Sequence, residues 1–600
     1  MIDLTIHRDS LQRTIERARA KGIIIPTFAQ MRNPDLIPEK IKARLRDVGL
    51  WDLNPLNLFR ITWRNEPKEK GGVYGGVNFI EIPHELTGVK ARIILLTGKW
   101  FPTGCHKVGA SFGCLVPRLV TGQFDPTYHK AVWPSTGNYC RGGAFNSKLL
   151  ACDSIAILPA EMSRERFEWL SNIAGEVIAT PGCESNVKEI FDKTWELRRT
   201  REDVVIFNQF EEMGNALWHY QVTGKAIQDA FESVRGEGDR FAGACFTSGS
   251  AGTMSAGDYL KEQYPHAKLA VGEALQCPTL LENGFGGHRI EGIGDKHVPW
   301  IHNVKNTDMV IDIDDEDSQK LLRLFNDPAG WQYLTDEVGV PADFVEKLPL
   351  LGISGIANML CCIKMAKYYE LTEHDVIATV GTDSAVMYQS RIAELAEADG
   401  PYTANMAAAD YAGHLRSVRT DAMEELTYQA RKRVHNLKYY TWVEQQGKTY
   451  EEIESLYTQD KLTDSAKALF EQLQKLKEEG EDVAGMIDDL NEEMKEAFTG
   501  TNTNAIADTI LQGFAEGKRS AKDFADDFQE MLNDAVLQGV KMKALEEPLR
   551  KWYESFATAS QNGLTADSIA SLKAQYDKII EDAAKQLEDM EKVTGITIGD

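Results

Sequence analysis

The chain has 600 residues, of which 43% are hydrophobic and 26% charged, and its formal net charge is −25. This length is too great for one ordinary hydrophobic core, and the composition is typical of globular proteins, so we expect at least two domains. The negative charge repels phosphate backbones, which argues against a nucleic-acid partner. No apolar stretch is long enough to span a bilayer, and charges interrupt the N-terminal region where a signal peptide would be apolar.

The first 460 residues alternate short β-branched segments with helical patterns. The predicted strands, in chain order, are 92–96, 131–133, 154–158, 204–207, 241–246, 269–271 and 376–380, and the sheet pattern closes with the last of them. Strands that alternate with helices predict mostly parallel sheets covered on both faces. Because ligands bind at the carboxyl ends of such strands, the loops that follow the strands are the candidate functional segments.

The loop after the strand at 92–96 contains the sequence WFPTGCHKVGA, in which Lys107 begins a small-residue, apolar helix. Most lysines are solvated surface charges, and that is the alternative for this one. A lysine at the start of a buried helix has a second explanation, because a desolvated amine has a lowered proton affinity and acts as a nucleophile or a base.

The loop after the strand at 131–133 reads WPSTGN and places hydroxyl and amide groups before a predicted helix. Its candidate residues are Ser135, Thr136, Gly137 and Asn138. Neutral donors beside the free backbone amides of a helix start suit a carboxylate ligand. A simple turn with no ligand has the same composition.

The loop after the strand at 241–246 consists almost wholly of small residues, namely Ser248, Gly249, Ser250, Ala251, Gly252 and Thr253. Backbone amides in such a loop can approach a phosphate closely, and the following helix aims its positive end at it. The loop matches neither the Walker pattern nor the dinucleotide-binding pattern. A tight strand-to-helix turn is the alternative explanation.

The loop after the strand at 376–380 reads TVGTDSAVMY and adds Ser384, for which a helix cap is the alternative role. Together the four loops supply an amine, a carboxylate cradle, a phosphate cradle and a neutral hydroxyl, a combination that suggests pyridoxal 5'-phosphate. Lys107 would carry this cofactor as a Schiff base and then act as the base at the substrate alpha carbon.

These motifs resemble those of the fold-type II pyridoxal-phosphate enzymes, the group that holds cysteine synthase, cystathionine beta-synthase, threonine synthase and the beta subunit of tryptophan synthase. PTGCHKVGA is similar to the lysine motif in its tryptophan-synthase form, and STGN to the substrate-carboxylate loop. SGSAGT stands in the place of the phosphate loop, and TDSAVMY is similar to the segment whose serine bonds the pyridine nitrogen. The order and spacing agree over about 54–392, which implies a two-lobed α/β fold with mostly parallel sheets.

The resemblance implies a role for each candidate residue. Lys107 is the catalytic residue and the covalent anchor of the cofactor, and the loop 248–253 holds the cofactor phosphate. Asn138 bonds the ring hydroxyl, and Ser384 bonds the ring nitrogen. The substrate carboxylate is assigned to Ser135, Thr136, Gly137 and Gln209.

The serine at the ring nitrogen also favours one kind of reaction. A serine cannot protonate the pyridine nitrogen as an aspartate would, so the ring is a weaker electron sink. This favours beta-elimination or beta-replacement on a beta-substituted L-amino acid through an aminoacrylate, of the cysteine synthase type. The alternatives are a serine or threonine dehydratase, or a structural protein whose function lies in a helical tail behind an inactive enzyme-like body.

Cysteine usage and charge complete the expectations about location and partners. Nine cysteines occur without a CxxC pair, so we expect reduced, buried thiols, no metal site and a cytoplasmic protein. The expected partners are a small amino-acid substrate and a second copy of the chain in a homodimer, with no membrane and no nucleic acid.

The composition changes near residue 460. All twelve histidines and all nine cysteines precede Lys461, so we predict a catalytic domain of two lobes at 1–460 and an all-helical module at 461–600. Thr463 and Thr565 are predicted helix N-caps in this module. Two of its stretches, 514–545 and 563–596, resemble C-terminal helices of phage tail tape-measure proteins, which suggests that two unrelated pieces are joined.

Overall fold

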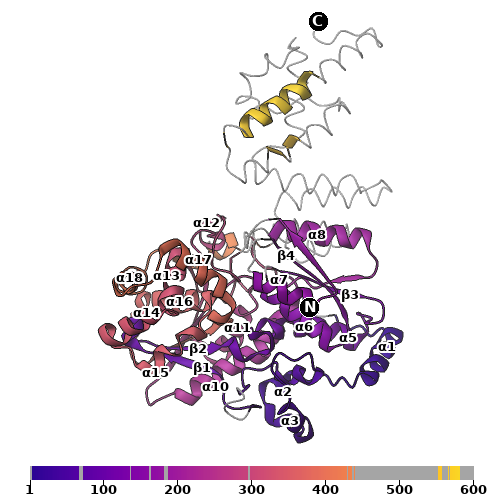
Figure 1. The fold of residues 1–600 in the computed structure, drawn as a ribbon, viewed down its shortest axis with the longest axis horizontal. Helices are drawn as coiled ribbons and strands as arrows, with labels where there is room; N and C mark the ends of the chain where they lie inside the picture. The colour runs from indigo at the N-terminus through magenta and orange to yellow at the C-terminus, as the bar shows by residue number, and fades with distance from the viewer. Residues whose placement is uncertain are drawn as a thin grey trace. The chain divides into compact units, whose positions relative to one another are not determined.

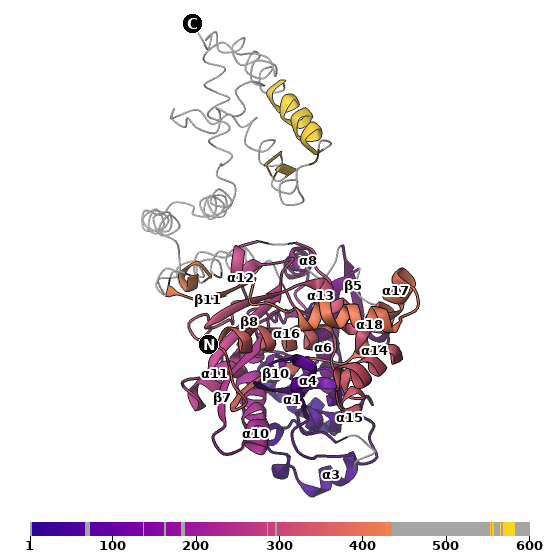
Figure 2. The same cartoon turned by 90° about the vertical axis from the view of Figure 1, so that its left-hand side faces the viewer.

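The computed structural model divides the chain into two compact units, Met1–Gln445 and Gln446–Asp600, and each is described here by itself. The structure describes residues 3–66, 72–135, 137–160, 164–181, 187–284, 286–294, 297–428, 430–434, 438, 552–553, 555–556, 565 and 568–581. The first unit holds two β-sheets with helices packed on them (Figure 1 and Figure 2).

The larger sheet has five parallel central strands and two antiparallel edge strands. Its order is β1 (Phe79–Ile82), β2 (Arg92–Thr97), β10 (Asp375–Gly381), β7 (Arg240–Thr247), β8 (Lys268–Ala274), β9 (Met309–Ile313) and β11 (Met423–Glu425). The central strands are buried almost throughout. Full burial explains why they are continuous apolar runs rather than alternating patterns.

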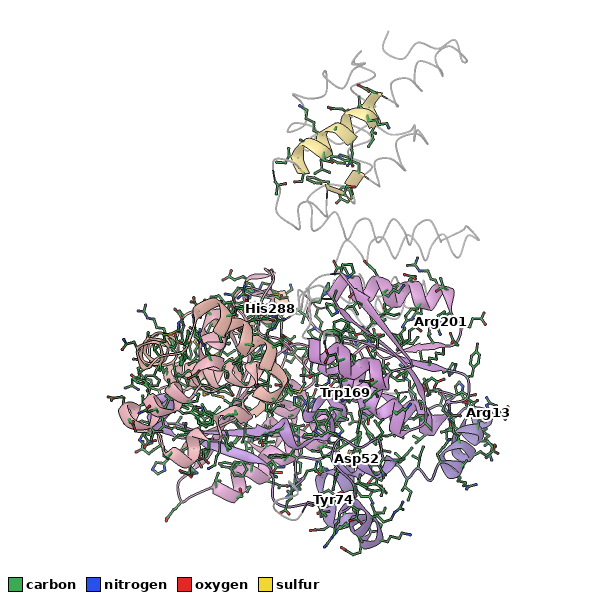
Figure 3. All side chains as sticks on the ribbon, viewed as in Figure 1. Arg13, Asp52, Tyr74, Trp169, Arg201 and His288 are labelled. Carbon is green, nitrogen blue, oxygen red and sulfur yellow. The ribbon has the colours of Figure 1, made fainter. Side chains whose placement is uncertain are left out.

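The smaller sheet is wholly parallel. Its order is β5 (Glu176–Thr180), β4 (Asp153–Pro159), β3 (Lys130–Pro134) and β6 (Val204–Ile206). Arg201, labelled in Figure 3, precedes β6 and joins two ends of this sheet, because its guanidinium pairs with Glu176 at 3.2 Å and with Asp203 at 2.8 Å.

Helices connect and cover the strands, as the alternating pattern predicted. They are α1 (Arg8–Ala20), α2 (Phe28–Arg32), α3 (Glu39–Leu45), α4 (His84–Thr87), α5 (Lys107–Thr121), α6 (Asn138–Leu149), α7 (Arg164–Ile173), α8 (Val187–Thr200), α9 (Met213–Trp218), α10 (Gly224–Val234), α11 (Met254–Gln263), α12 (Thr279–Glu282), α13 (Asp315–Leu324), α14 (Pro328–Tyr333), α15 (Ala342–Val345), α16 (Ile353–Tyr368), α17 (Gln389–Asp399) and α18 (Ala404–Asp410). Among the described residues, no single helix has the length and apolar character to cross a membrane, although one sharply bent pair, Ala342–Leu350 with Ile353–Tyr368, meets the criterion when joined.

The predicted α/β fold with mostly parallel sheets is confirmed. All seven strands expected from the sequence are present, as β2, β3, β4, β6, β7, β8 and β10. The prediction that β10 closes the sheet was wrong, because β11 follows it and pairs antiparallel with β9. β11 has only three residues, Met-Glu-Glu, and a strand so short and polar carries no pattern that periodicity can detect.

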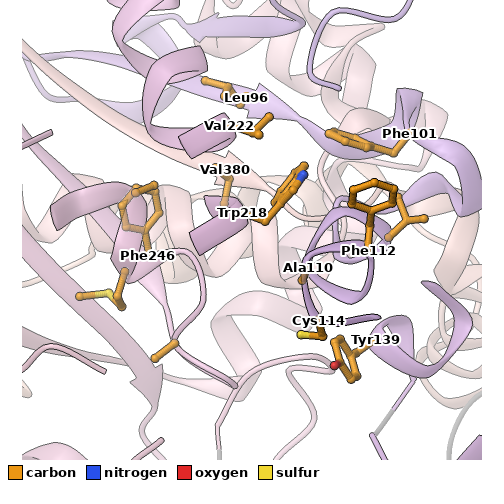
Figure 4. Packing of buried hydrophobic residues seen from close by; sticks show 14 of the residues in the cluster. Leu96, Phe101, Ala110, Phe112, Cys114, Tyr139, Trp218, Val222, Phe246 and Val380 are labelled. Carbon is orange, nitrogen blue, oxygen red and sulfur yellow. The ribbon is translucent and has the colours of Figure 1, made fainter. Parts of the chain in front are cut away.

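Close packing fixes the direction of α5, the helix that begins with Lys107. A Cβ added at Gly109 would lie 2.1 Å from the ring of Trp218, so only glycine lets α5 and α9 approach this closely. The Trp218 ring in turn packs edge-on against Phe101, with centroids 6.0 Å apart, and Figure 4 shows both rings with Phe112 around the start of α5. The lysine therefore projects from a rigid, buried support.

In the second unit the structure describes residues 568–581, which are helical, and a few residues near them. Thr565 Oγ1 accepts a hydrogen bond from the backbone N–H of Ser568 at 3.1 Å, and the backbone N–H of Thr565 donates to Ser568 Oγ at 2.8 Å. This reciprocal pair confirms Thr565 as a helix N-cap. Thr463 and the stretch 514–545 lie outside the described residues, and the resemblance of the tail to phage proteins stays a prediction.

Candidate active site

Lys107 lies at the first position of α5, after a turn in which Thr103 and Gly104 both adopt left-handed backbone angles, with φ of 69° and 68°. Its side chain is half-buried. The Nζ atom lies 3.4 Å from Gln209 Oε1, and the lysine donates in this contact. The amine is therefore held at the edge of the interior, next to a residue that the sequence assigned to the substrate carboxylate.

Gln209 continues the hydrogen bonds to the loop that follows β3. Its Nε2 donates to Ser135 Oγ at 3.2 Å, and the same oxygen accepts from the backbone N–H of Gly137 at 3.2 Å. Ser135 and Gln209 are both 2% exposed. The structure thus brings four predicted residues into one network, while Thr136 lies outside the described residues.

The predicted phosphate loop joins β7 to α11. Within the described residues, no hydrogen bond uses the backbone N–H groups of 249–253. Ala251 has a φ of 59°, a left-handed conformation that strains a residue with a Cβ. A Cβ added at Gly252 would lie 2.3 Å from Asn215 Oδ1 and 2.9 Å from the His219 ring. The loop is therefore a set of unused donors in a space that larger side chains would fill.

Lys107 and this loop line the same cavity. The other lining residues are His106, Ala110, Asn215, His219, Thr247, Gly292, Ile293 and Thr382. Asn215 joins the network because its Nδ2 donates to the Gln209 carbonyl at 3.0 Å and to Ser250 Oγ at 3.1 Å. Asn215 and His219 are not predicted from the sequence, because they follow Gln209 by six and ten positions in NQFEEMGNALWHY without a recognisable ligand pattern.

Two buried histidines stand behind Lys107. The rings of His106 and His219 are nearly perpendicular, with centroids 5.0 Å apart. Burial, reinforced by the charge of Lys107, lowers the pKa of His106 to about 3. Burial and the neighbouring His106 and Lys107 lower the pKa of His219 well below its usual value. Both imidazoles are therefore neutral at neutral pH and add no positive charge beside the lysine.

The loop after β10, a strand of the same larger sheet as β2 and β7, also contributes to the site. Asn138, at the start of α6, donates its Nδ2 to Asp383 Oδ2 at 2.7 Å. The residue of this loop that lines the cavity is Thr382, whose carbonyl accepts from the His106 backbone N–H at 3.3 Å. Ser384 is buried at 2% exposure and precedes a short helix without capping it, so its predicted contact with the ring nitrogen stays a prediction.

These residues fit the predicted cofactor. Pyridoxal phosphate needs an amine to bind covalently, several N–H donors for a phosphate and polar contacts at its ring. The cavity offers Lys107 and the amides of 249–253. Two buried oxygen atoms near the predicted ring and phosphate positions, Ser248 Oγ and Asn138 Oδ1, have no hydrogen-bond partner among the described residues.

Known proteins resemble about half of this chain. No protein-family model matches it. It is 27% identical over 301 residues to a probable cysteine synthase of Bacillus subtilis, an alignment that covers 50% of this chain and 89% of that protein. It is 26% identical over 316 residues to the cystathionine beta-synthase of Saccharomyces cerevisiae, covering 51% of this chain and 59% of that protein. Among solved structures, a cysteine synthase of Entamoeba histolytica aligns with a TM-score of 0.47 at 18% identity, covering 57% of this chain and 94% of that one.

Proposed function

We propose that the protein is a pyridoxal-phosphate-dependent enzyme of the cysteine synthase type, which acts on a beta-substituted L-amino acid by beta-elimination or beta-replacement. The observation that carries the proposal is that one cavity is lined both by the Lys107 side chain and by the unused backbone amides of 249–253. Sequence similarity to cysteine synthases and to a cystathionine beta-synthase supports it.

Different residues of the cavity bind the phosphate group, bind the substrate carboxylate and move the proton. The amides of 249–253 and the positive end of α11 bind the phosphate group. Ser135 and Gln209, which already share a hydrogen bond, bind the substrate carboxylate. When bound, the cofactor withdraws electrons from the substrate alpha carbon. Lys107 would hold the cofactor covalently through Nζ, and its free amine would be the base that accepts the proton from that carbon.

Two neutral histidine rings line the same cavity as Lys107. The rings of His106 and His219 lie with their centroids 5.0 Å apart, and burial keeps both rings neutral, so they add no positive charge beside Lys107. Lys107 Nζ donates to the neutral Oε1 of Gln209 at 3.4 Å.

Substitution of Lys107 tests the proposal. Lys107→Ala should abolish turnover and covalent attachment of the cofactor while the circular dichroism spectrum stays unchanged. Borohydride reduction followed by peptide mapping should place the pyridoxyl group on Lys107 in the wild-type protein. Lys99→Ala is the matched control, because Lys99 precedes the same loop and its Nζ lies over the Trp100 ring, 5.1 Å from the centroid. A pyridoxyl group found on another lysine would show the assignment to be wrong.

The choice between elimination and replacement is a second measurement. A panel of beta-substituted amino acids is incubated with and without a thiol or sulfide. Keto acid released without a nucleophile indicates elimination, as in the dehydratase alternative, and a new amino acid formed only with it indicates replacement. The proposal includes a homodimer, which analytical ultracentrifugation of the full chain measures directly.

A further inference from the structure

Asp383 links the loop after β10 to the start of α6. Its side chain is fully buried. The Oδ2 atom accepts two hydrogen bonds, from Asn138 Nδ2 at 2.7 Å and from the Tyr388 hydroxyl at 2.9 Å. Asn138 and Asp383 are 245 positions apart in the chain. The contact therefore joins two loops that the proposed function places on the cofactor ring. One loop follows β3 of the smaller sheet, and the other follows β10 of the larger sheet.

The carboxylate decides which way the Asn138 carboxamide faces. The oxygen and nitrogen of an amide are nearly equal in size, and a neutral partner can accept either orientation. In the structure the atom of Asn138 that faces Asp383 Oδ2 is the nitrogen, which is the orientation that a carboxylate oxygen selects because it accepts hydrogen bonds. This leaves one further N–H on Nδ2, together with a buried Oδ1, and neither has a hydrogen-bond partner in the part of the chain that the structure describes.

We infer that Asp383 is a positioning residue that holds one N–H of Asn138 on its own carboxylate and thereby presents the other N–H to the ring oxygen of the cofactor. The inference rests on the proposed function, because it takes Asn138 as the contact of that oxygen. An N–H group stabilises an ionised ring oxygen, whereas an inverted amide would present its carbonyl oxygen and repel it. Asp383 acts on the ring only through Asn138.

A double-mutant cycle tests this dependence. Asp383→Asn keeps the shape of the side chain but accepts either amide orientation, and Asn138→Ala removes the group that Asp383 is said to hold. Each single variant of the full chain should raise the cofactor dissociation constant, measured by equilibrium dialysis, by about threefold to tenfold, the effect of one hydrogen bond. The pH at which the bound cofactor changes its absorbance should rise in both. The double variant should be no worse than Asn138→Ala alone, because the second change then has nothing left to act on.

The controls separate this role from a structural one. Tyr388→Phe removes the hydrogen bond from the Tyr388 hydroxyl to Asp383 Oδ2 but leaves the contact with Asn138, so the absorbance transition should stay at the wild-type pH. If Asp383→Asn does not fold, the exchanged double variant Asn138→Asp/Asp383→Asn is measured in its place. In that variant the amide at position 383 donates to the carboxylate at position 138. That pair should regain stability but not affinity, since a carboxylate now faces the ring oxygen.

The outcomes are distinguishable. Additive effects in the cycle, or recovery of affinity as well as stability in the exchanged pair, overturn the positioning role alone while the wild-type protein still binds the cofactor. A wild-type protein that binds no cofactor overturns the proposed function, and the inference with it.

Discussion

Gly252 offers the sharpest test of the phosphate loop, because a methyl group added there would press on Asn215 and on the His219 ring. The added Cβ would lie 2.3 Å from Asn215 Oδ1 and 2.9 Å from both Asn215 Cγ and the His219 ring. Asn215 cannot simply move away, because its Nδ2 donates to the Gln209 carbonyl and to Ser250 Oγ at 3.0 and 3.1 Å. The substitution must therefore displace either the loop or the hydrogen-bonded side chain.

The size of the effect follows from these two routes. Overpacking a buried site costs about 1–3 kcal/mol, and a broken hydrogen bond adds about 0.5–1.5 kcal/mol. For Gly252→Ala we expect about 1–3 kcal/mol if the loop moves, and about 1.5–4.5 kcal/mol if Asn215 also loses a hydrogen bond. If the loop moves, the cost appears as weaker cofactor binding, and if it does not, the cost appears as a less stable apoprotein.

Two measurements on Gly252→Ala capture both routes, namely the cofactor dissociation constant from titration of the apoprotein and the free energy of unfolding of the apoprotein from denaturant titration. Gly413→Ala is the matched control, because a Cβ there meets nothing within 4 Å, and it should leave the dissociation constant unchanged. If Gly252→Ala leaves both the affinity and the stability at wild-type values, the loop is not packed closely against Asn215. The assignment of residues 249–253 as the phosphate-binding loop would then be refuted.

Three further predictions concern the ring contact, the buried histidines and the tail. Ser384→Ala should lower turnover more than it weakens cofactor binding, since one neutral hydrogen bond contributes on the order of 1 kcal/mol, and equal losses in both would contradict the role. Burial holds the pKa of His106 at about 3, below its unfolded value of about 6.5, so the unfolded chain binds one more proton and the free energy of unfolding falls as the pH drops below about 6.5. His106→Gln should reduce this pH dependence by up to about 1.4 kcal/mol per pH unit between about pH 6 and 4, as measured by denaturant titration. An unchanged pH dependence would rule out a neutral buried His106. A chain that stops at Gln459 should keep its cofactor absorbance and kinetic constants within a few-fold, because every candidate site residue precedes it, and a colourless or insoluble product would move the predicted domain boundary.

The local pattern of the sequence determined the elements that carry the candidate site. The apolar runs before Ser135, Ser248 and Ser384 are buried central strands, and a strand of this kind is recognisable because both of its faces exclude water. The small residues after the strand at 241–246 indicate that the backbone there can approach another group closely. Lys107 is recognisable because a lysine is rarely buried unless it is paired or takes part in chemistry. Strand, loop and helix are all set by residues near one another in the chain.

Only the tertiary structure decided which distant residues meet. His219 enters the cavity because α9 packs on the glycine face of α5, a contact that no local pattern announces. Asp383 has the composition of an ordinary turn residue, and its link to Asn138 depends on two sheets placing loops 245 positions apart side by side. The short edge strand β11 exists because β9 offers it free backbone groups. In each case the deciding energy comes from a partner far away in the chain, and the periodicity of a single segment does not contain that information.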